Sequence, residues 1–303
     1  MYRKRIAFAI SSAVAASFLS SGAQAGALEE VIVTAQHRAQ NVQDVPIAVT
    51  AMSGEMMAKA DIFDLSGIAQ HTPGLSYSEF APGQVYPALR GISSADDGAG
   101  LDNSAALFLD GVYIGRSAGI NFDMFDLERI EVLRGPQGTL FGRNAIGGAI
   151  NVVSQKPTQD THLKFGATVG NEGILRYQGL ISGGLSDNVA GKITFSHREH
   201  DGYVRNVLLN KDLQDEDSDS VRGQLVFSAG SSEWTLTADY MEDDRDDMGR
   251  TPIVEGNYPY PTYIREEMGT SGRENAQPVD GFSKREAYGV SLQGVIEFDS
   301  GVF

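Results

Sequence analysis

The sequence predicts an α+β domain followed by antiparallel β-strands of an incomplete transmembrane β-barrel. Residues 45–157 combine short β-prone runs with helical patterning around a glycine-rich turn. From Leu163 onward the pattern changes to alternating apolar and polar residues, with no helix between the strands. The connections between these strands alternate between short and long, as in membrane barrels.

Residues 1–25 are expected to be a signal peptide. A basic run precedes the apolar segment Ile6–Leu19, and Ala-Gln-Ala at positions 23–25 fits a cleavage site. The apolar segment is shorter than the roughly 20 residues that a membrane-spanning helix needs. We therefore expect an exported protein whose mature chain begins at Gly26.

The composition excludes several classes of function. The 303 residues carry a formal net charge of −16 and are 41% hydrophobic. Such an acidic chain is unsuited to nucleic acid, whose phosphates require clusters of Lys and Arg. Cysteine is absent, which excludes disulfides, thiol nucleophiles and cysteine-bound metal.

The α+β domain is expected to begin with a strand and two helices. The following elements are predicted in chain order: a strand at 45–50, helices at 54–60 and 64–71, a hairpin at 108–113, and strands at 130–133 and 149–153. The dipeptide Asp110-Gly111 between apolar runs predicts a type I′ turn for the hairpin. A linker that contains Pro157 closes the domain.

A glycine-rich turn joins the last two strands of this domain. Its spacing partly matches a phosphate-binding loop, but Gly148 stands where that loop requires lysine, so no nucleotide site is predicted. Tightly folded backbone is the expected role of its glycines. They are Gly135, Gly138, Gly142, Gly147 and Gly148.

Six amphipathic strands are predicted after the domain. They cover residues 163–169, 175–182, 189–196, 221–229, 234–240 and 288–298. The connections after the second and fourth strands are tight, whereas those after the third and fifth are long. A soluble sandwich would use turns of similar length, so this parity favours an outer-membrane barrel. Aromatic residues near the strand ends fit its interfacial girdles.

Three motifs together carry a family resemblance. The run Ile130–Val153, with Leu89-Arg90-Gly91 and Phe108–Tyr113, closely resembles the plug domain of TonB-dependent outer-membrane receptors. The resemblance spans residues 29–157. It implies a TonB box and linker over 26–44, a plug over 45–157 and the first barrel strands over 161–303. It also implies a fragment of a larger barrel, located in the bacterial outer membrane with plug and TonB box facing the periplasm.

A β-prone run follows the expected cleavage site. It fits either an edge strand of the next domain or a strand that pairs with a partner's sheet edge. The run looks like the family's TonB box, which binds the periplasmic C-terminal domain of TonB. The residues concerned are Glu30, Val31, Ile32, Val33, Thr34 and Ala35.

Two arginines lie in Leu-Arg-Gly contexts. The resemblance implies that Arg90 and Arg134 bond to barrel glutamates, which would lie beyond residue 303. The alternative is a pair of solvated loop arginines, because a buried unpaired charge is costly.

No catalytic residue, cofactor site or metal site is predicted, and the protein is not expected to be an enzyme. His197 and His200 are three residues apart on a strand, so they should point to opposite faces.

Both long connections, 198–220 and 241–286, are rich in acidic residues. A solvated surface accounts for this composition, and divalent-cation bridging at lipopolysaccharide is the more specific interpretation. The second connection also contains an aromatic cluster that suits stacking on a sugar or planar ligand, or simple packing. Its residues are Tyr258, Tyr260 and Tyr263.

The resemblance implies energy-coupled uptake of a scarce small ligand, of siderophore, cobalamin or oligosaccharide class, across the outer membrane. The partners expected are TonB, outer-membrane lipid, lipopolysaccharide and the ligand, with no nucleic acid. Three alternatives remain: a passive plugged porin, a surface adhesin and a non-functional truncated product. The run at 29–35 favours coupled uptake, because a porin does not require it.

Overall fold

The computed structural model describes residues 32–33, 40–41, 43, 45–62, 64–94, 103–116, 125–249, 273–298 and 301–302. Residues from Ile32 onward form one compact unit. The expected signal peptide lies outside the described residues. Among these residues, no helix is long and apolar enough to cross a membrane.

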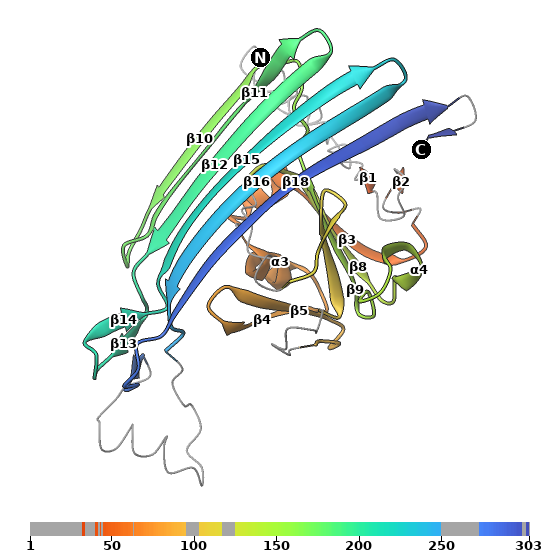
Figure 1. Ribbon diagram of the computed structural model, residues 1–303. Helices are drawn as coiled ribbons and strands as arrows, with labels where there is room; N and C mark the ends of the chain where they lie inside the picture. The colour runs from red at the N-terminus through yellow and green to blue at the C-terminus, as the bar shows by residue number, and fades with distance from the viewer. Residues whose placement is uncertain are drawn as a thin grey trace, which may run out of the picture. The chain divides into compact units, whose positions relative to one another are not determined.

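The α+β domain is built on a five-stranded mixed sheet (Figure 1). The strands run in the order β3-β8-β9-β6-β7, and β6 pairs with β9 in parallel. Their bounds are β3 Ala48–Ser53, β6 Ala105–Leu109, β7 Val112–Ile114, β8 Leu127–Arg134 and β9 Gly148–Ser154. The predicted β-prone runs are therefore confirmed as strands, with ends moved by a few residues.

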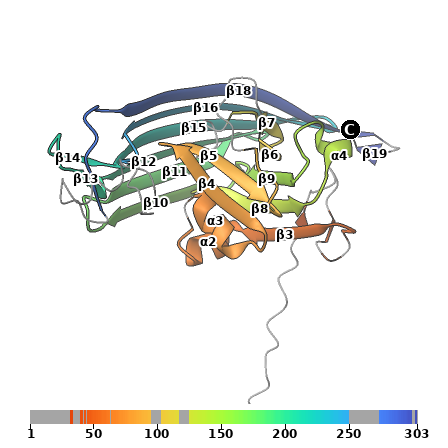
Figure 2. The ribbon, with the colours of Figure 1, turned by 90° about the horizontal axis from the view of Figure 1, so that it is seen from below.

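Helices α2 (Gly54–Lys59) and α3 (Leu65–His71) confirm the two predicted helices, and the structure shows that each begins at a side-chain cap. The hydroxyl of Ser53 accepts a bond from the Met56 amide, at 3.2 Å, and caps α2. The Asp64 carboxylate accepts from the Gly67 amide at 2.8 Å and caps α3. A further short helix, α4 (Gly138–Phe141), lies in the glycine-rich turn, and the hairpin β4 (Leu75–Ala81) and β5 (Gln84–Leu89) follows α3 (Figure 2).

A single hydrophobic core holds this domain together. Its fully buried members include Met57, Ile68, Leu107, Ile130 and Ile150, drawn from both helices and from the three central strands of the sheet. Every member of this core cluster lies between Met52 and Val152. All residues of this core cluster therefore come from the domain itself.

The hairpin predicted around Asp110-Gly111 is confirmed. Asp110 has φ of 48° and Gly111 has φ of 79°, the two positive values that a type I′ turn requires. Leu109 pairs with Val112 at the turn.

A second, seven-stranded sheet follows the linker (Figure 1). Its order is β10-β11-β12-β15-β16-β18-β19, antiparallel throughout, so β10 and β19 are edge strands in the described part of the chain. The bounds are β10 His162–Val169, β11 Leu175–Ser186, β12 Val189–His200, β15 Glu216–Ala229, β16 Ser232–Asp246, β18 Phe282–Phe298 and β19 Gly301–Val302. All six predicted strands are confirmed, and most are longer than predicted.

The turn parity is confirmed as well. Two residues separate β11 from β12 and two separate β15 from β16, whereas long connections follow β12 and β16. The first long connection contains β13 (Val204–Asn206) and β14 (Lys211–Leu213), and β13 pairs in parallel with β17 (Glu274–Asn275) from the second. The sequence analysis missed these short strands because two or three residues carry no periodic signal.

Candidate functional site

The large sheet has two chemically different faces. One face, called the outer face here, carries exposed apolar side chains such as Phe165, Ile193 and Leu292. The opposite face carries polar side chains that contact the plug, and we call it the plug face. Because side chains alternate along a strand, Lys192 on the plug face is the direct neighbour of Ile193 on the outer face.

Asp110, at the tip of the β6–β7 hairpin, is the first contact point between plug and strands. Its carboxylate accepts a bond from the guanidinium of Arg222 in β15. The same carboxylate accepts the Ser154 amide and the Ser154 hydroxyl, each at 2.7 Å. Gln224 donates to the Ser154 hydroxyl at 3.1 Å, and Gln293 donates to the Asp110 carbonyl. Two strands, β15 and β18, therefore hold one turn of the plug.

Lys192 in β12 is the second contact point. Its ammonium group pairs with the Asp126 carboxylate and donates to the Gln155 carbonyl, and its side chain is only 3% exposed. Burial raises the pKa of the Asp126 carboxyl above its ordinary value, although Lys192 acts in the opposite direction. Desolvation of this pair thus outweighs its attraction.

The third contact point is the turn of the β4–β5 hairpin. Arg285 in β18 donates to the Gly83 carbonyl, and Ser283 donates to the Pro82 carbonyl at 3.3 Å. Arg285 also pairs with Asp243, which is fully buried.

A network of charges on the plug face continues from this hairpin. Arg245 forms ion pairs with Glu216 at 2.7 Å and Asp243 at 2.9 Å, and lies 3.9 Å from Glu79 of the plug. Arg198 reaches Glu216 at 3.2 Å. Burial also raises the pKa of the plug residue Tyr77, which therefore stays protonated. The interface is polar at all three contact points.

The sequence-predicted arginines make contacts within the plug. Arg134 donates to the Pro73 carbonyl at 3.1 Å, and the backbone amide of Arg90 donates to the Gly74 carbonyl at 2.7 Å. The barrel glutamates that the resemblance assigns to them would lie beyond residue 303, so this pairing stays a prediction.

The contacts of Asp110, Asp126, Lys192 and Arg222 were not predicted from the sequence, which identified Asp110 only as a turn residue. For Lys192 and Arg222, the sequence contained a pattern that could have identified them. Lys192 and Arg222 are charged residues within amphipathic strands whose other face is apolar. A charge at that position must point to water or to a partner inside the barrel.

Among the motif glycines, Gly148 has the clearest requirement. Its φ is 147°, and a β-carbon there would meet the backbone carbonyl of Leu133 in the neighbouring strand. Gly135 and Gly142 also have positive φ, whereas Gly138 has open space around it. Gly147 would place a β-carbon in ordinary contact with Leu89 and Ile92.

The predicted TonB box is described only in part. Ile32–Val33 forms strand β1, which pairs antiparallel with β2, Gln40–Asn41. Val33 is fully buried. In this structure the strand is therefore paired within its own chain. Glu30, Val31, Thr34 and Ala35 lie outside the described residues, as do Tyr258, Tyr260 and Tyr263.

The two histidines of β12 point to opposite faces, as predicted. His197 contacts Asp219 at 3.0 Å on the outer face, whereas His200 lies 3.7 Å from Glu216 on the plug face.

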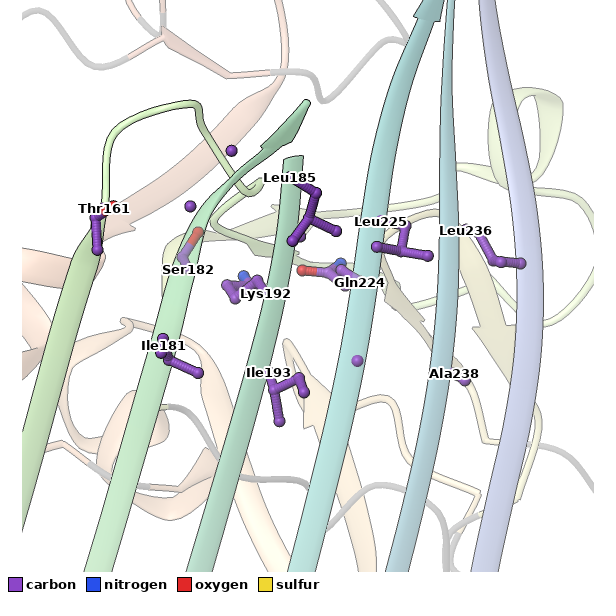
Figure 3. Close-up of a pocket in the computed structure, with 14 residues that line it drawn as sticks. Thr161, Ile181, Ser182, Leu185, Lys192, Ile193, Gln224, Leu225, Leu236 and Ala238 are labelled. Carbon is purple, nitrogen blue, oxygen red and sulfur yellow. The ribbon is translucent and has the colours of Figure 1, made fainter. Parts of the chain in front are cut away.

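A shallow apolar groove of about 580 Å³ lies on the outer face (Figure 3). Four glycines and an alanine leave space between larger side chains from β11, β12, β15 and β16. The larger side chains are Ile181, Ile193, Leu225 and Leu236. Lys192 also lines the groove, but its ammonium group pairs with Asp126 on the plug face, and most of the lining side chains are apolar.

Comparison with known proteins agrees with this architecture. Residues 41–149 match the family model of the TonB-dependent Receptor Plug Domain. The catecholate siderophore receptor Fiu of Escherichia coli O6:H1 is 24% identical over 196 residues, which are 63% of this chain and 24% of that protein. The vitamin B12 transporter BtuB of Photobacterium profundum is 24% identical over 204 residues, 65% of this chain and 32% of that protein.

Solved structures show the same fold. The ferric yersiniabactin uptake receptor FyuA of Yersinia pestis superposes with a TM-score of 0.71 at 23% identity, covering 84% of this chain and 39% of that one. The ferripyoverdine receptor of the outer membrane of Pseudomonas aeruginosa superposes with a TM-score of 0.70 at 18% identity, covering 90% and 35%. This chain thus spans between about a quarter and two fifths of these proteins. Residues 41–149 therefore form a TonB-dependent receptor plug domain, and the chain as a whole resembles the corresponding part of TonB-dependent outer-membrane receptors.

Proposed function

We propose that this chain is the part of a receptor that closes the pore and receives the pull of TonB during uptake of a scarce ligand. The observation that carries the proposal is the polar interface between plug and strands. Asp110, Asp126 and the β4–β5 turn are held by side chains from β12, β15 and β18, through ion pairs and hydrogen bonds. Water can replace such contacts when the plug moves, at a smaller cost than exposing an apolar interface.

The proposal includes an orientation. The tight turns after β11 and β15 face the periplasm, and the long connections after β12 and β16 face outward. The β4–β5 hairpin contacts the ends of β16 and β18 next to the long connections, so this hairpin is the outward-facing part of the plug. Ligand would bind on that side. In the proposal Arg90 and Arg134 pair with more distant barrel glutamates, and Tyr258, Tyr260 and Tyr263 line the ligand loop.

The TonB box at Glu30–Ala35 would be the point of attachment. In the proposal β1 leaves β2 and adds to a sheet edge of the periplasmic TonB domain. Pairing with Gln40–Asn41 satisfies the backbone of Ile32 and Val33 until that exchange. Strand exchange of this kind trades one set of backbone hydrogen bonds for another, so its net free energy is small. The proposed role is a transporter, and no enzymatic step is part of it.

The ligand proposed is a small molecule of siderophore, cobalamin or oligosaccharide class. Fiu and BtuB carry names of the first two classes, a catecholate siderophore and vitamin B12.

The experiment is accumulation of labelled ferric siderophores, cobalamin and maltooligosaccharides by cells that express the receptor, with and without TonB. We expect one ligand class to accumulate only when TonB is present, while surface binding persists without it. Equal accumulation in both strains would favour a passive plugged porin. Cells that lack the receptor provide the background.

A further inference from the structure

The outer face of the large sheet carries an unusual concentration of carboxylates where its strands approach the long connections. Two adjacent rows of directly paired residues cross the sheet there. The first row is Tyr177, His197, Asp219, Glu242 and Glu286, and the second is Leu175, Glu199, Asp217, Asp244 and Lys284. We call these ten residues the acidic rows.

Six carboxylates and one lysine occupy the acidic rows. Four directly opposite pairs are like-charged: Asp219 with Glu242, Glu242 with Glu286, Glu199 with Asp217, and Asp217 with Asp244. Like charges directly opposite each other destabilise a sheet. A cation bound among these carboxylates would reduce this repulsion.

Lys284 provides this cation at one end of the rows. Its ammonium group lies 3.0 Å from Asp244 and 3.5 Å from Glu242. At the other end, β12 and β15 contribute three carboxylates and a single imidazole. His197 Nδ1 lies 3.0 Å from Asp219 Oδ1, and Nε2 lies 3.6 Å from Glu199 Oε2.

The imidazole end brings together three side chains that could hold a metal ion. Ligand atoms of His197, Asp217 and Asp219 all lie within 4.8 Å of one another. Asp217 and Asp219 are two residues apart on β15, so both face outward, and Asp219 is directly opposite His197. A first-row divalent ion at its usual bond length of about 2.1 Å requires ligand atoms between about 3 and 4 Å apart. The Asp219 side chain is 65% exposed and free to turn through the remaining distance.

Two features hold the imidazole in place. Its ring stacks on Tyr177 of β11, with centroids 4.6 Å apart and an interplanar angle of 23°. It also projects from the middle of a three-strand segment rather than from a loop, and ligands on rigid elements bind metal more readily.

We propose that His197, Asp217 and Asp219 bind a divalent transition-metal ion, with Zn²⁺ the best chemical match. Imidazole selects zinc and its neighbours over Mg²⁺ and Ca²⁺, which prefer oxygen ligands alone. The ion takes the place of the His197–Asp219 hydrogen bond and neutralises the β12–β15 end of the acidic rows. The site lies on the outer face and is separate from the plug contacts, so it is independent of ligand transport.

The experiment uses the protein purified from outer membranes in detergent, stripped with a chelator and dialysed. Zn²⁺ binding is measured by calorimetry and by metal analysis after gel filtration. Co²⁺ serves as a spectroscopic substitute whose visible bands report nitrogen and oxygen ligands. We expect one ion per chain and no displacement by a hundredfold excess of Mg²⁺.

The variants identify the ligands. His197→Gln and Asp219→Asn should each lower Zn²⁺ affinity at least tenfold and remove the Co²⁺ bands. His200→Gln is the matched control, because His200 is on the same strand but on the plug face, and it should bind as the wild type does. Circular dichroism tests whether each variant keeps its strands. If one of them does not, Asp217→Asn is measured in its place.

Three results would overturn the proposal. They are absence of bound Zn²⁺ in the wild type, unchanged affinity in a folded His197→Gln protein, and displacement of Zn²⁺ by Mg²⁺. The last would mean that the acidic rows attract cations by charge alone.

Discussion

At the residue scale, Asp110 has both a backbone role and a side-chain role. Its φ of 48° begins the β6–β7 turn, and its carboxylate joins Ser154 of the plug to Arg222 of β15. Aspartate and asparagine both tolerate positive φ, whereas alanine rarely does. Substitution of Asp110 by asparagine keeps the turn but removes the charge, whereas substitution by alanine removes both. Comparing the two variants therefore separates the backbone role from the side-chain role.

We predict that Asp110→Asn costs about 1–2 kcal/mol of the free energy of unfolding, because Arg222 loses its charged partner while the turn is kept. Asp110→Ala should cost about 3 kcal/mol or more, because the turn and every carboxylate bond are lost. Urea unfolding of the purified protein measures both. Asp187→Asn, at an exposed residue of the β11–β12 turn, is the control and should stay within about 0.5 kcal/mol of wild type. Equal costs for the two Asp110 variants would contradict the proposed role of the turn.

Asp126 predicts a pH dependence of stability. Burial raises its pKa in the folded protein above the ordinary value of 3.8, so the folded state takes up a proton first as the pH falls. The contribution of the Asp126 carboxyl to the free energy of unfolding is therefore fully present below pH 3.8. It is lost as the pH rises through the pKa that this carboxyl has in the folded protein. We expect Asp126→Asn to remove this component, so that its stability relative to wild type increases from pH 4 to pH 7. A relative stability of Asp126→Asn that falls over this range would show that the pairing with Lys192 outweighs burial.

At the element scale, the glycine-rich turn depends on one glycine much more than on another. Gly148 begins β9 with φ of 147° and no room for a β-carbon against Leu133, whereas Gly138 begins α4 in open space. Gly148→Ala should lower the free energy of unfolding by about 2–3 kcal/mol, through strain in the β8–β9 pairing. Gly138→Ala should leave stability unchanged or raise it by up to about 1 kcal/mol, because alanine favours a helix. Thermal unfolding of the plug measures both, and a neutral Gly148→Ala would disprove the steric argument.

Strand β1 is the second element with a predicted phenotype. Strand addition requires backbone donors in an extended conformation, and proline at position 32 removes one donor and fixes φ. In the full-length receptor we expect Ile32→Pro to abolish uptake while ligand still binds at the cell surface. Ile32→Ala keeps the donor and should lose only part of the uptake. Labelled-ligand binding and accumulation, at equal expression, provide the readouts. Normal uptake by Ile32→Pro would mean that another segment couples the receptor to TonB.

At the scale of the whole molecule, the two parts differ in how they bury apolar surface. The plug has its own core, Met52 to Val152, whereas the large sheet exposes apolar side chains across its outer face and has open edges at β10 and β19. We expect residues 45–157 to fold alone as a soluble monomer and residues 161–303 to aggregate in water, because unpaired edges and apolar faces associate. Separate expression and gel filtration test this. A soluble, monomeric 161–303 would contradict the assignment to a barrel.

The features that the sequence predicted well are local. The Asp110-Gly111 turn, the helices predicted at 54–60 and 64–71, and the alternation along six strands each depend on residues close together in the chain. Backbone sterics, capping and the two-residue period of a strand act over a few positions. The sequence by itself therefore determined most element types, their order and the turn parity, but not the β4–β5 hairpin, helix α4 or the short strands β13, β14 and β17.

Only the tertiary structure decided which polar residues meet. Asp110 and Arg222 are 112 positions apart, Asp126 and Lys192 are 66 apart, and Gly83 and Arg285 are 202 apart. The same holds for the acidic rows, where β15 brings Asp217 and Asp219 beside His197 through the register of two strands. Register and the position of the plug follow from the packing of whole faces, a sum over many residues that no short pattern encodes. The physical reason is distance along the chain: local rules fix what an element is, and long-range packing alone fixes what it touches.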